Sequence, residues 1–183
     1  MLRYARNTGR DACATRRKMV SLSDNQKIEI LRRSYTSIDG LWFLKLEEKY
    51  GFEAALEVDR EVWKVFPKVQ ARLLKSMAGH NSGLDALLDC YTARLALENF
   101  TFHTEKSADG VKVIIEKCPW HDIMMKSGRE KLSGRIGDVI CQSECETWAK
   151  EFGEDLRFES GGRICKGDKA CVVDFALLAN NPS

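Results

Sequence analysis

Hydrophobic residues in the first half of the chain recur at the three- and four-residue spacing of amphipathic helices. Ser23 is a good N-cap for the first helix, and Gln26, three residues further on, completes a capping box. The apolar positions that follow are Ile28, Leu31, Tyr35, Ile38, Trp42 and Leu46. Gly51 is a natural end for this helix, because glycine is common at helix C-termini.

The same spacing predicts two further helices. One covers about 53–78, where Pro67 is expected to kink the helix or split it in two and Gly79 to end it. The other runs over about 83–99. Four aromatic residues at helical spacing indicate core packing rather than a ligand site: Trp42, Phe43, Trp63 and Phe66.

After these helices the pattern changes to that of short strands. Segments 100–106 and 111–117 flank Ser107–Gly110, a sequence typical of a β-hairpin turn. A short helical stretch and then a helix over about 134–152 come next. Three more strands are expected, over 155–160, 163–166 and 170–178. N-terminal helices followed by an antiparallel sheet with one inserted helix define an α+β fold.

Charge separates a basic start from a mildly acidic body. The first twenty residues hold six basic side chains and one acidic one, or +5, which leaves −3 for the rest of a chain whose net charge is +2. We expect residues 1–21 to form a flexible basic tail, or an upstream extension if translation starts at Met19. Residues 22–183 are expected to form a single α+β domain, with a helical part over 22–99 and a sheet part over 100–183.

Several classes of protein are disfavoured by these totals. A mildly acidic body gives no electrostatic case for nucleic-acid binding. No apolar run approaches the ~20 residues of a membrane-spanning helix, and the basic start lacks the apolar stretch of a secretory signal. We therefore expect a cytoplasmic protein that is not bound to a membrane. No phosphate-binding loop, dinucleotide fingerprint or nucleophile elbow is present.

The seven cysteines are the strongest chemical signal in the chain. In a protein that is not secreted they indicate thiols, metal ligands or redox chemistry rather than a disulfide scaffold. Cys13 lies in the expected tail and Cys90 in a predicted helix. The remaining five lie in the sheet part: Cys118, Cys141, Cys145, Cys165 and Cys171. They come from one helix, one hairpin and one strand end, so all five can border one cavity.

Soft thiolate ligands in this number favour a site for zinc or an iron–sulfur cluster. The candidate metal ligands are Cys118, Cys141, Cys145 and Cys171, with Cys165 or His121 as alternates. The spacing contains neither a C-x-x-C knuckle nor a ferredoxin-type run. An alternative therefore stays open, in which the cysteines are small buried hydrophobic residues without chemistry.

Short motifs in the sheet part resemble those of a known family. They are Cys118-Pro119-Trp120, Gly137 with Ile140-Cys141, and Gly167-Asp168-x-x-Cys171 with Phe175. In these the chain resembles the L-2-amino-thiazoline-4-carboxylic acid hydrolase-like family and, more distantly, the 4-vinyl reductase domain. The segments 39–43 and 53–56 look like an uncharacterised branch from anaerobic archaea and bacteria. The resemblance covers most of residues 22–178, and it implies an α+β domain with a ligand cavity near a cysteine site.

The resemblance implies a hydrolase that opens a thiazoline ring, with Cys118, Cys141, Gly167, Asp168 and Cys171 at the matching motif positions. Cys145 and Cys165 are additions to that pattern, and they favour metal or cluster binding instead. The first hypothesis is thus a metal-binding domain that senses, carries or assists a partner enzyme in anaerobic metabolism.

Two other hypotheses remain open. One is a hydrolase of small cyclic amides or thiazolines, in which the thiolate of Cys141 or Cys171, or a metal-bound water, attacks and His121 or Asp168 handles the proton. The other is a non-catalytic domain that binds a small molecule or takes part in assembly. The two long amphipathic helices are compatible with a homodimer.

Overall fold

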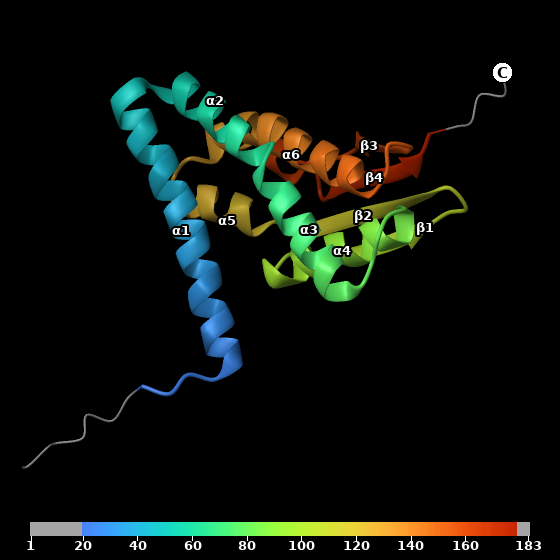
Figure 1. Cartoon of the computed structure of the whole chain (residues 1–183). Coiled ribbons are helices and arrows are strands. Elements are labelled where there is room, and N and C mark those ends of the chain that lie inside the picture. Colours follow the sequence, from blue (N-terminus) through green and yellow to red (C-terminus); the bar gives the residue numbers. More distant parts are fainter. Residues whose placement is uncertain (1–19, 179–183) are drawn as a thin grey trace, which may run out of the picture.

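The computed structural model describes residues 20–178 (Figure 1), and its elements run from helices to strands. The first four elements are α1 (Asp24–Tyr50), α2 (Phe52–Trp63), α3 (Phe66–Ala78) and α4 (Leu84–Leu97). They are followed by β1 (Thr101–Lys106), β2 (Gly110–Lys117), α5 (Pro119–Lys126), α6 (Glu130–Phe152), β3 (Leu156–Ser160), the 3-10 helix η1 (Ile164–Lys166) and β4 (Cys171–Leu177). The expected α+β fold is confirmed. Residues 1–19, with most of the expected tail, Cys13 and Met19, lie outside the described residues.

The helix boundaries follow the capping signals in the sequence. The Ser23 hydroxyl accepts a hydrogen bond from the backbone N–H of Gln26, and the Gln26 side chain accepts one from the backbone of Ser23. The expected second helix is split in two, and α3 begins directly before Pro67. Proline fits there because the first turn of a helix has no intrahelical partner for its N–H groups. None of the helices within residues 20–178 is long and apolar enough to cross a membrane.

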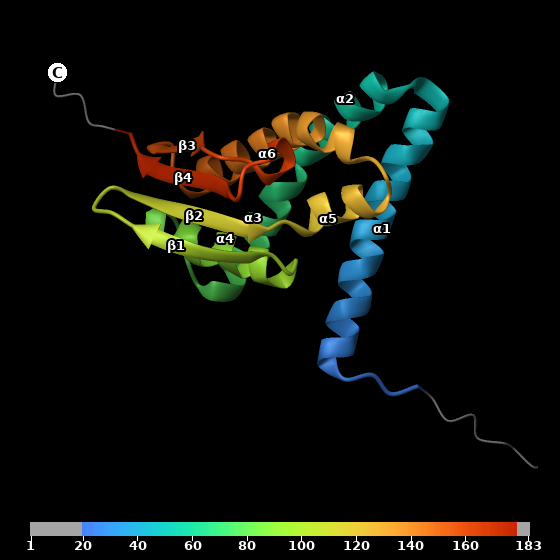
Figure 2. The same cartoon turned by 180° about the vertical axis from the view of Figure 1, so that it is seen from behind.

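The four strands form an antiparallel sheet in the order β1-β2-β4-β3. Val111 lies opposite Phe175 and Val113 opposite Val173, so the inward residues of the two central strands meet on one face. This face packs against α4 and α6, where Tyr91, Trp148 and other large side chains are fully buried, and α3 packs on these two helices. Figure 2 shows the opposite face of the sheet without a covering helix. The domain therefore has one helical layer over one sheet.

The expected strand over residues 163–166 is wrong, because residues 164–166 form η1. Cys165 and Cys171 consequently do not face each other across two paired strands. The backbone N–H groups of this segment bond locally: that of Arg163 donates to the Asp168 carboxylate and that of Ile164 to the sulfur of Cys171. β3 pairs directly with β4, so the segment between them is free to curl toward α6.

Helix α1 also departs from the expectation. It is a projecting arm in both Figure 1 and Figure 2, and none of its residues is buried. Trp42, expected in the core, is 66 % exposed. Trp63 and Phe66 do pack inward, against one another and near Trp120. The helical periodicity of α1 therefore marks an apolar face that the described part of this chain does not cover.

Candidate functional site

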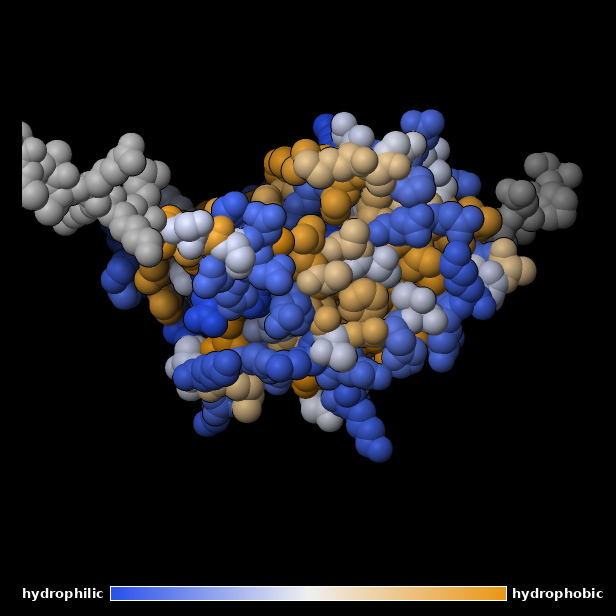
Figure 3. All heavy atoms as spheres, turned by 90° about the horizontal axis from the view of Figure 1, so that it is seen from below, coloured by the Kyte–Doolittle hydropathy of each residue, from blue (hydrophilic) through white to orange (hydrophobic). Residues whose placement is uncertain are grey.

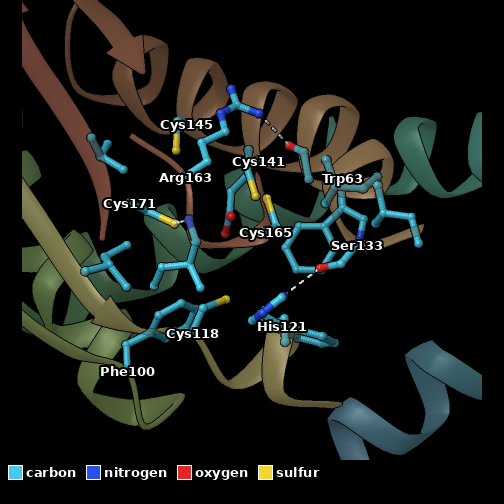
Figure 4. Close-up of a pocket in the computed structure, with 18 of the residues that line it drawn as sticks. Trp63, Phe100, Cys118, His121, Ser133, Cys141, Cys145, Arg163, Cys165 and Cys171 are labelled. Carbon is cyan, nitrogen blue, oxygen red and sulfur yellow. Dashed lines mark hydrogen bonds between the residues drawn. The ribbon is translucent and has the colours of Figure 1, made fainter. Parts of the chain in front are cut away.

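A cavity of about 200 Å³ lies where α6, α5, η1 and the ends of β2 and β4 meet. Its lining includes the five cysteines of the sheet part: Cys118, Cys141, Cys145, Cys165 and Cys171. Figure 4 shows their sulfur atoms around one space. The expectation that these thiols border a single cavity is confirmed. The remaining described cysteine, Cys90, is buried in the main core and does not line the cavity.

Each thiol reaches the cavity from a different local structure. Cys118 directly follows β2 and occupies the N-cap position of α5, whose first residue is Pro119. Cys141 and Cys145 are one turn apart on α6, so both side chains lie on the same side of that helix. Cys171 is the first residue of β4, and its sulfur accepts a hydrogen bond of 3.2 Å from the backbone N–H of Ile164.

Two glycines of α6 let η1 approach closely enough to bring in the fifth thiol. A β-carbon at Gly134 would lie 3.1 Å from the carbonyl oxygen of Cys165. A β-carbon at Gly137 would lie 2.9 Å from the sulfur of Cys165 and 3.8 Å from that of Cys141. Glycine at i and i+3 thus forms the shallow groove into which Cys165 fits beside Cys141.

Arg163 fastens this turn to α6. Its guanidinium Nη1 donates to the carboxylate of Asp138 at 2.8 Å and to the carbonyl of Gly137 at 3.2 Å. Asp168 acts within the turn, because its carboxylate accepts the backbone N–H of Arg163 at 2.6 Å. Asp168 is not among the residues that line the cavity. The expected role of Asp168 in proton transfer stays a prediction. Its hydrogen bond to the backbone of Arg163 stabilises the loop.

The cavity thiols are uncharged near neutral pH, because burial raises the pKa of each. It raises the pKa of Cys118 and of Cys145 to about 12, and it also raises those of Cys141, Cys165 and Cys171. Cys141 is the most exposed of the five, and its side chain lines the cavity. A thiol must ionise to attack a carbon or to bind a metal, so either reaction requires the loss of a proton.

One wall of the cavity carries a buried charged cluster. Arg94 is 3 % exposed, and its guanidinium pairs with the carboxylates of Glu144 and Glu98; its Nε lies 3.0 Å from Oε1 of Glu98. Glu98 also accepts hydrogen bonds from the Trp120 indole at 3.1 Å and from Gln70 at 3.2 Å. Burial raises the pKa of Glu144 to about 7, although Arg94 lowers it. Arg94 and Glu144 both line the cavity, so a cation and a titrating carboxyl lie within reach of a bound molecule.

Most of the remaining lining is apolar. It is made of aromatic and branched aliphatic side chains, among them Trp63, Phe100, Ile115, Trp120, Ile136 and Val173. The lining also holds a polar pair: Nδ1 of His121 lies 2.9 Å from the hydroxyl of Ser133, and Figure 4 shows this hydrogen bond. His121, an expected alternate ligand and proton carrier, therefore does line the cavity, together with a serine partner.

The predicted metal ligands share the cavity without forming a site for one ion. Within residues 20–178, no three cysteine, histidine or carboxylate side chains lie close enough together to hold a single metal ion. A tetrahedral zinc site requires four ligand atoms within about 2.3 Å of the metal, so it would need side chains to turn inward. The metal role and the hydrolytic role of these residues both stay predictions.

Sequence reasoning missed the charged wall of the cavity. Glu144 stands on the same helical face as Cys141 and Cys145, three residues after the first and one before the second. Arg94 and Glu98 are four apart on α4, the spacing of a helical ion pair, and Arg94 follows the buried Tyr91 by three residues. A charged pair on an otherwise apolar helix face was the signal in the sequence that could have indicated this buried cluster.

A search of curated proteins found no match to this chain. The model of a protein family, described as a family of unknown function (DUF6125), matches residues 19–169. These residues extend from the start of α1 through η1, and they include four of the five cavity thiols. Neither finding bears on the resemblance to the thiazoline hydrolase-like family, which stays a prediction. Because the match covers more than half of the chain, the protein belongs to the family of unknown function DUF6125.

Proposed function

We propose that the protein binds a small, largely apolar molecule in the thiol-lined cavity. The observation that carries this proposal is the cavity itself, which is walled by aromatic rings, aliphatic side chains and five uncharged thiols. Uncharged thiols behave as small, polarisable hydrophobic groups. Such a wall favours a ligand with an apolar body.

The size of the cavity limits the ligand. An apolar cavity of ~150 Å³ in a protein core is large enough to bind benzene. A volume of about 200 Å³ therefore suits a molecule with one substituted ring. The pairing of Arg94 with Glu144 supplies one polar anchor, so the ligand is expected to carry a polar group at one end.

The test is a set of thermal unfolding scans of the full chain with benzene and with indole as probes. A ligand at ~100 times its dissociation constant stabilises a protein by about 2.7 kcal/mol, which is a measurable rise in melting temperature. Replacing Cys141 by phenylalanine puts a ring into the cavity and should abolish the rise. The control Glu146→Gln changes an exposed residue of the same helix and should keep it. If neither probe stabilises the wild type, and mass spectrometry finds no co-purified molecule, the proposal is wrong.

A second candidate is a thiolate-bound metal centre, which the convergence of five cysteines on one cavity favours. Four thiolates can hold either a zinc ion or an iron–sulfur cluster, and in both cases the side chains would have to turn toward one another. Iron, zinc and acid-labile sulfide should be measured on protein purified without oxygen. Cys141→Ser and Cys165→Ser should lose the metal, while Cys90→Ser, outside the cavity, should keep it. Equal metal content in all three variants would exclude this candidate.

A further inference from the structure

The exposed side of α1 carries hydrophobic residues that the sequence pattern assigns to a buried face. The α1 stripe consists of Ile28, Leu31, Ile38 and Trp42, which are between 48 and 69 % exposed. Tyr35 belongs to the same row of apolar positions, but it packs against Phe66 and Trp120 and ties the middle of the helix to the body. The four residues of the α1 stripe are left exposed by the described part of the chain.

A second hydrophobic stripe runs along α2 and α3. Its residues recur every three or four positions across the junction of the two helices: Val58, Val62, Val65, Val69, Leu73 and Met77. They are between 45 and 74 % exposed, whereas Ala55, Trp63 and Ala71 on the other side of the same helices are buried. On the face of the molecule that is seen from below, other hydrophobic residues also reach the surface between charged ones (Figure 3).

We propose that two copies of this chain pair through these stripes, with the α1 stripe of each packed against the α2–α3 stripe of the other. In a two-fold pair, if residue i of one chain contacts residue j of its partner, then j also contacts i. One interface would thus cover both stripes on both chains. The lengths of the two surfaces also agree, because α1 has 27 residues and the consecutive helices α2 and α3 have 12 and 13.

The area available matches that of a stable dimer. A standard interface removes ~800 Å² from water on each partner, and obligate homodimers remove more. The ten side chains of the two stripes, each about half exposed or more, would together remove on the order of 1,000 Å² from each chain. At ~25 cal/mol per Å² this burial is large enough to offset the cost of association.

A second copy explains the two stripes better than the chain's own first nineteen residues do. Six of those residues are arginine or lysine, and apolar residues among them show no helical or strand periodicity. Such a segment has no continuous apolar face with which to cover ten hydrophobic side chains.

The test is the mass of the full chain in solution, measured by sedimentation equilibrium up to ~100 μM, since dimerisation depends on concentration. Wild type should sediment at twice the mass of one chain. Leu31→Glu and Val69→Glu, one on each stripe, should each sediment as monomers with unchanged circular dichroism. Ser37→Glu and Lys68→Glu place the same side chain at exposed positions off the stripes and should leave the dimer intact.

Three results would overturn the proposal. One is a wild type that stays monomeric over the whole concentration range. Another is a dimer that persists in both stripe variants. The third is a monomer in which hydrogen exchange shows that the first nineteen residues protect α1.

Discussion

Replacing Arg94 by methionine should reveal how strongly the charged wall of the cavity depends on its single cation. The guanidinium lies between the buried carboxylates of Glu98 and Glu144 and packs over the rings of Tyr91 and Phe100, with its central carbon 5.7 and 5.3 Å from their centroids. Methionine keeps much of the side-chain volume but removes the charge and every N–H donor. Two buried carboxylates would then lack a cation.

The expected loss depends on pH. Removing one partner of a buried ion pair destabilises a protein by about 3–5 kcal/mol, because the other charge stays buried without compensation. We expect this loss at about pH 8, where the Glu144 carboxylate is ionised in the wild type. The pKa of Glu144 is already raised to about 7 by burial, and it rises further when Arg94 no longer lowers it. At about pH 5 Glu144 is neutral with and without Arg94, so the loss should be smaller than at pH 8 by ~1–2 kcal/mol, at about 1.4 kcal/mol for each pH unit above the wild-type pKa of Glu144.

Urea unfolding of wild type and Arg94→Met at the two pH values measures the difference in free energy of unfolding directly. The double variant Arg94→Met/Glu144→Gln is the matched control, because it removes one of the uncompensated charges and should recover part of the stability at high pH. A loss below ~1 kcal/mol at high pH, or one that does not change with pH, would refute the reasoning, since both results imply a solvated cluster.

Three further substitutions test separate parts of the argument. Burial, and next the charge of Asp39, raise the pKa of Asp59 to about 7, so the folded state binds this proton more tightly than the unfolded state and loses stability as pH rises from about 4 through 7. Asp59→Asn should therefore gain melting temperature relative to wild type between about pH 5 and 8, and a constant difference would contradict this. Gly137→Ala places a methyl group 2.9 Å from the Cys165 sulfur and should lower the free energy of unfolding by ~1–3 kcal/mol. Adding Cys165→Ala should restore most of it, and no rescue would mean that the clash lies elsewhere. Gly167 has φ +96°, so Gly167→Ala should cost ~1 kcal/mol, again measured by urea unfolding, and an unchanged value would show that the turn relaxes.

Local signals in the sequence predicted most of the elements. The capping box at Ser23, the hairpin turn before Gly110 and the alternation along β4 depend on residues close together in the chain, and the structure has all three. The strand expected over 163–166 failed for a reason that no local pattern carries. That segment is held against α6 by the ion pair of Arg163 with Asp138, a contact that arises only after the chain has folded, and the hydrogen bond from Arg163 to Asp168 then closes the loop.

The cavity was predictable in part. The face shared by Cys141 and Cys145 and the inward direction of Cys171 follow from helix and strand periods. The charged wall did not follow from these rules, because Arg94 comes from α4 and Glu144 from α6, and only the tertiary fold brings them together. Trp42 of α1 was wrongly expected in the core, since periodicity shows that a helix face is apolar but not whether the same chain covers it.

Selection for stability alone would not maintain a cavity of this kind. A substitution that fills it should therefore raise the stability of the protein and abolish the binding of a ligand. The side chains that line this space of about 200 Å³ lack the packing partners that a filled core would give them. Leucine or isoleucine in place of the cysteines would fill much of the space with apolar side chains. In Cys141→Phe the ring occupies part of the cavity, and we expect the free energy of unfolding to rise by ~0.5–2 kcal/mol, the range for cavity-filling substitutions. The same variant should no longer respond to benzene or indole. If the cavity is kept for a ligand, Cys141→Phe should be more stable than the wild type and should no longer bind the probes. Lower stability would mean that the space around Cys141 is too narrow to hold a ring.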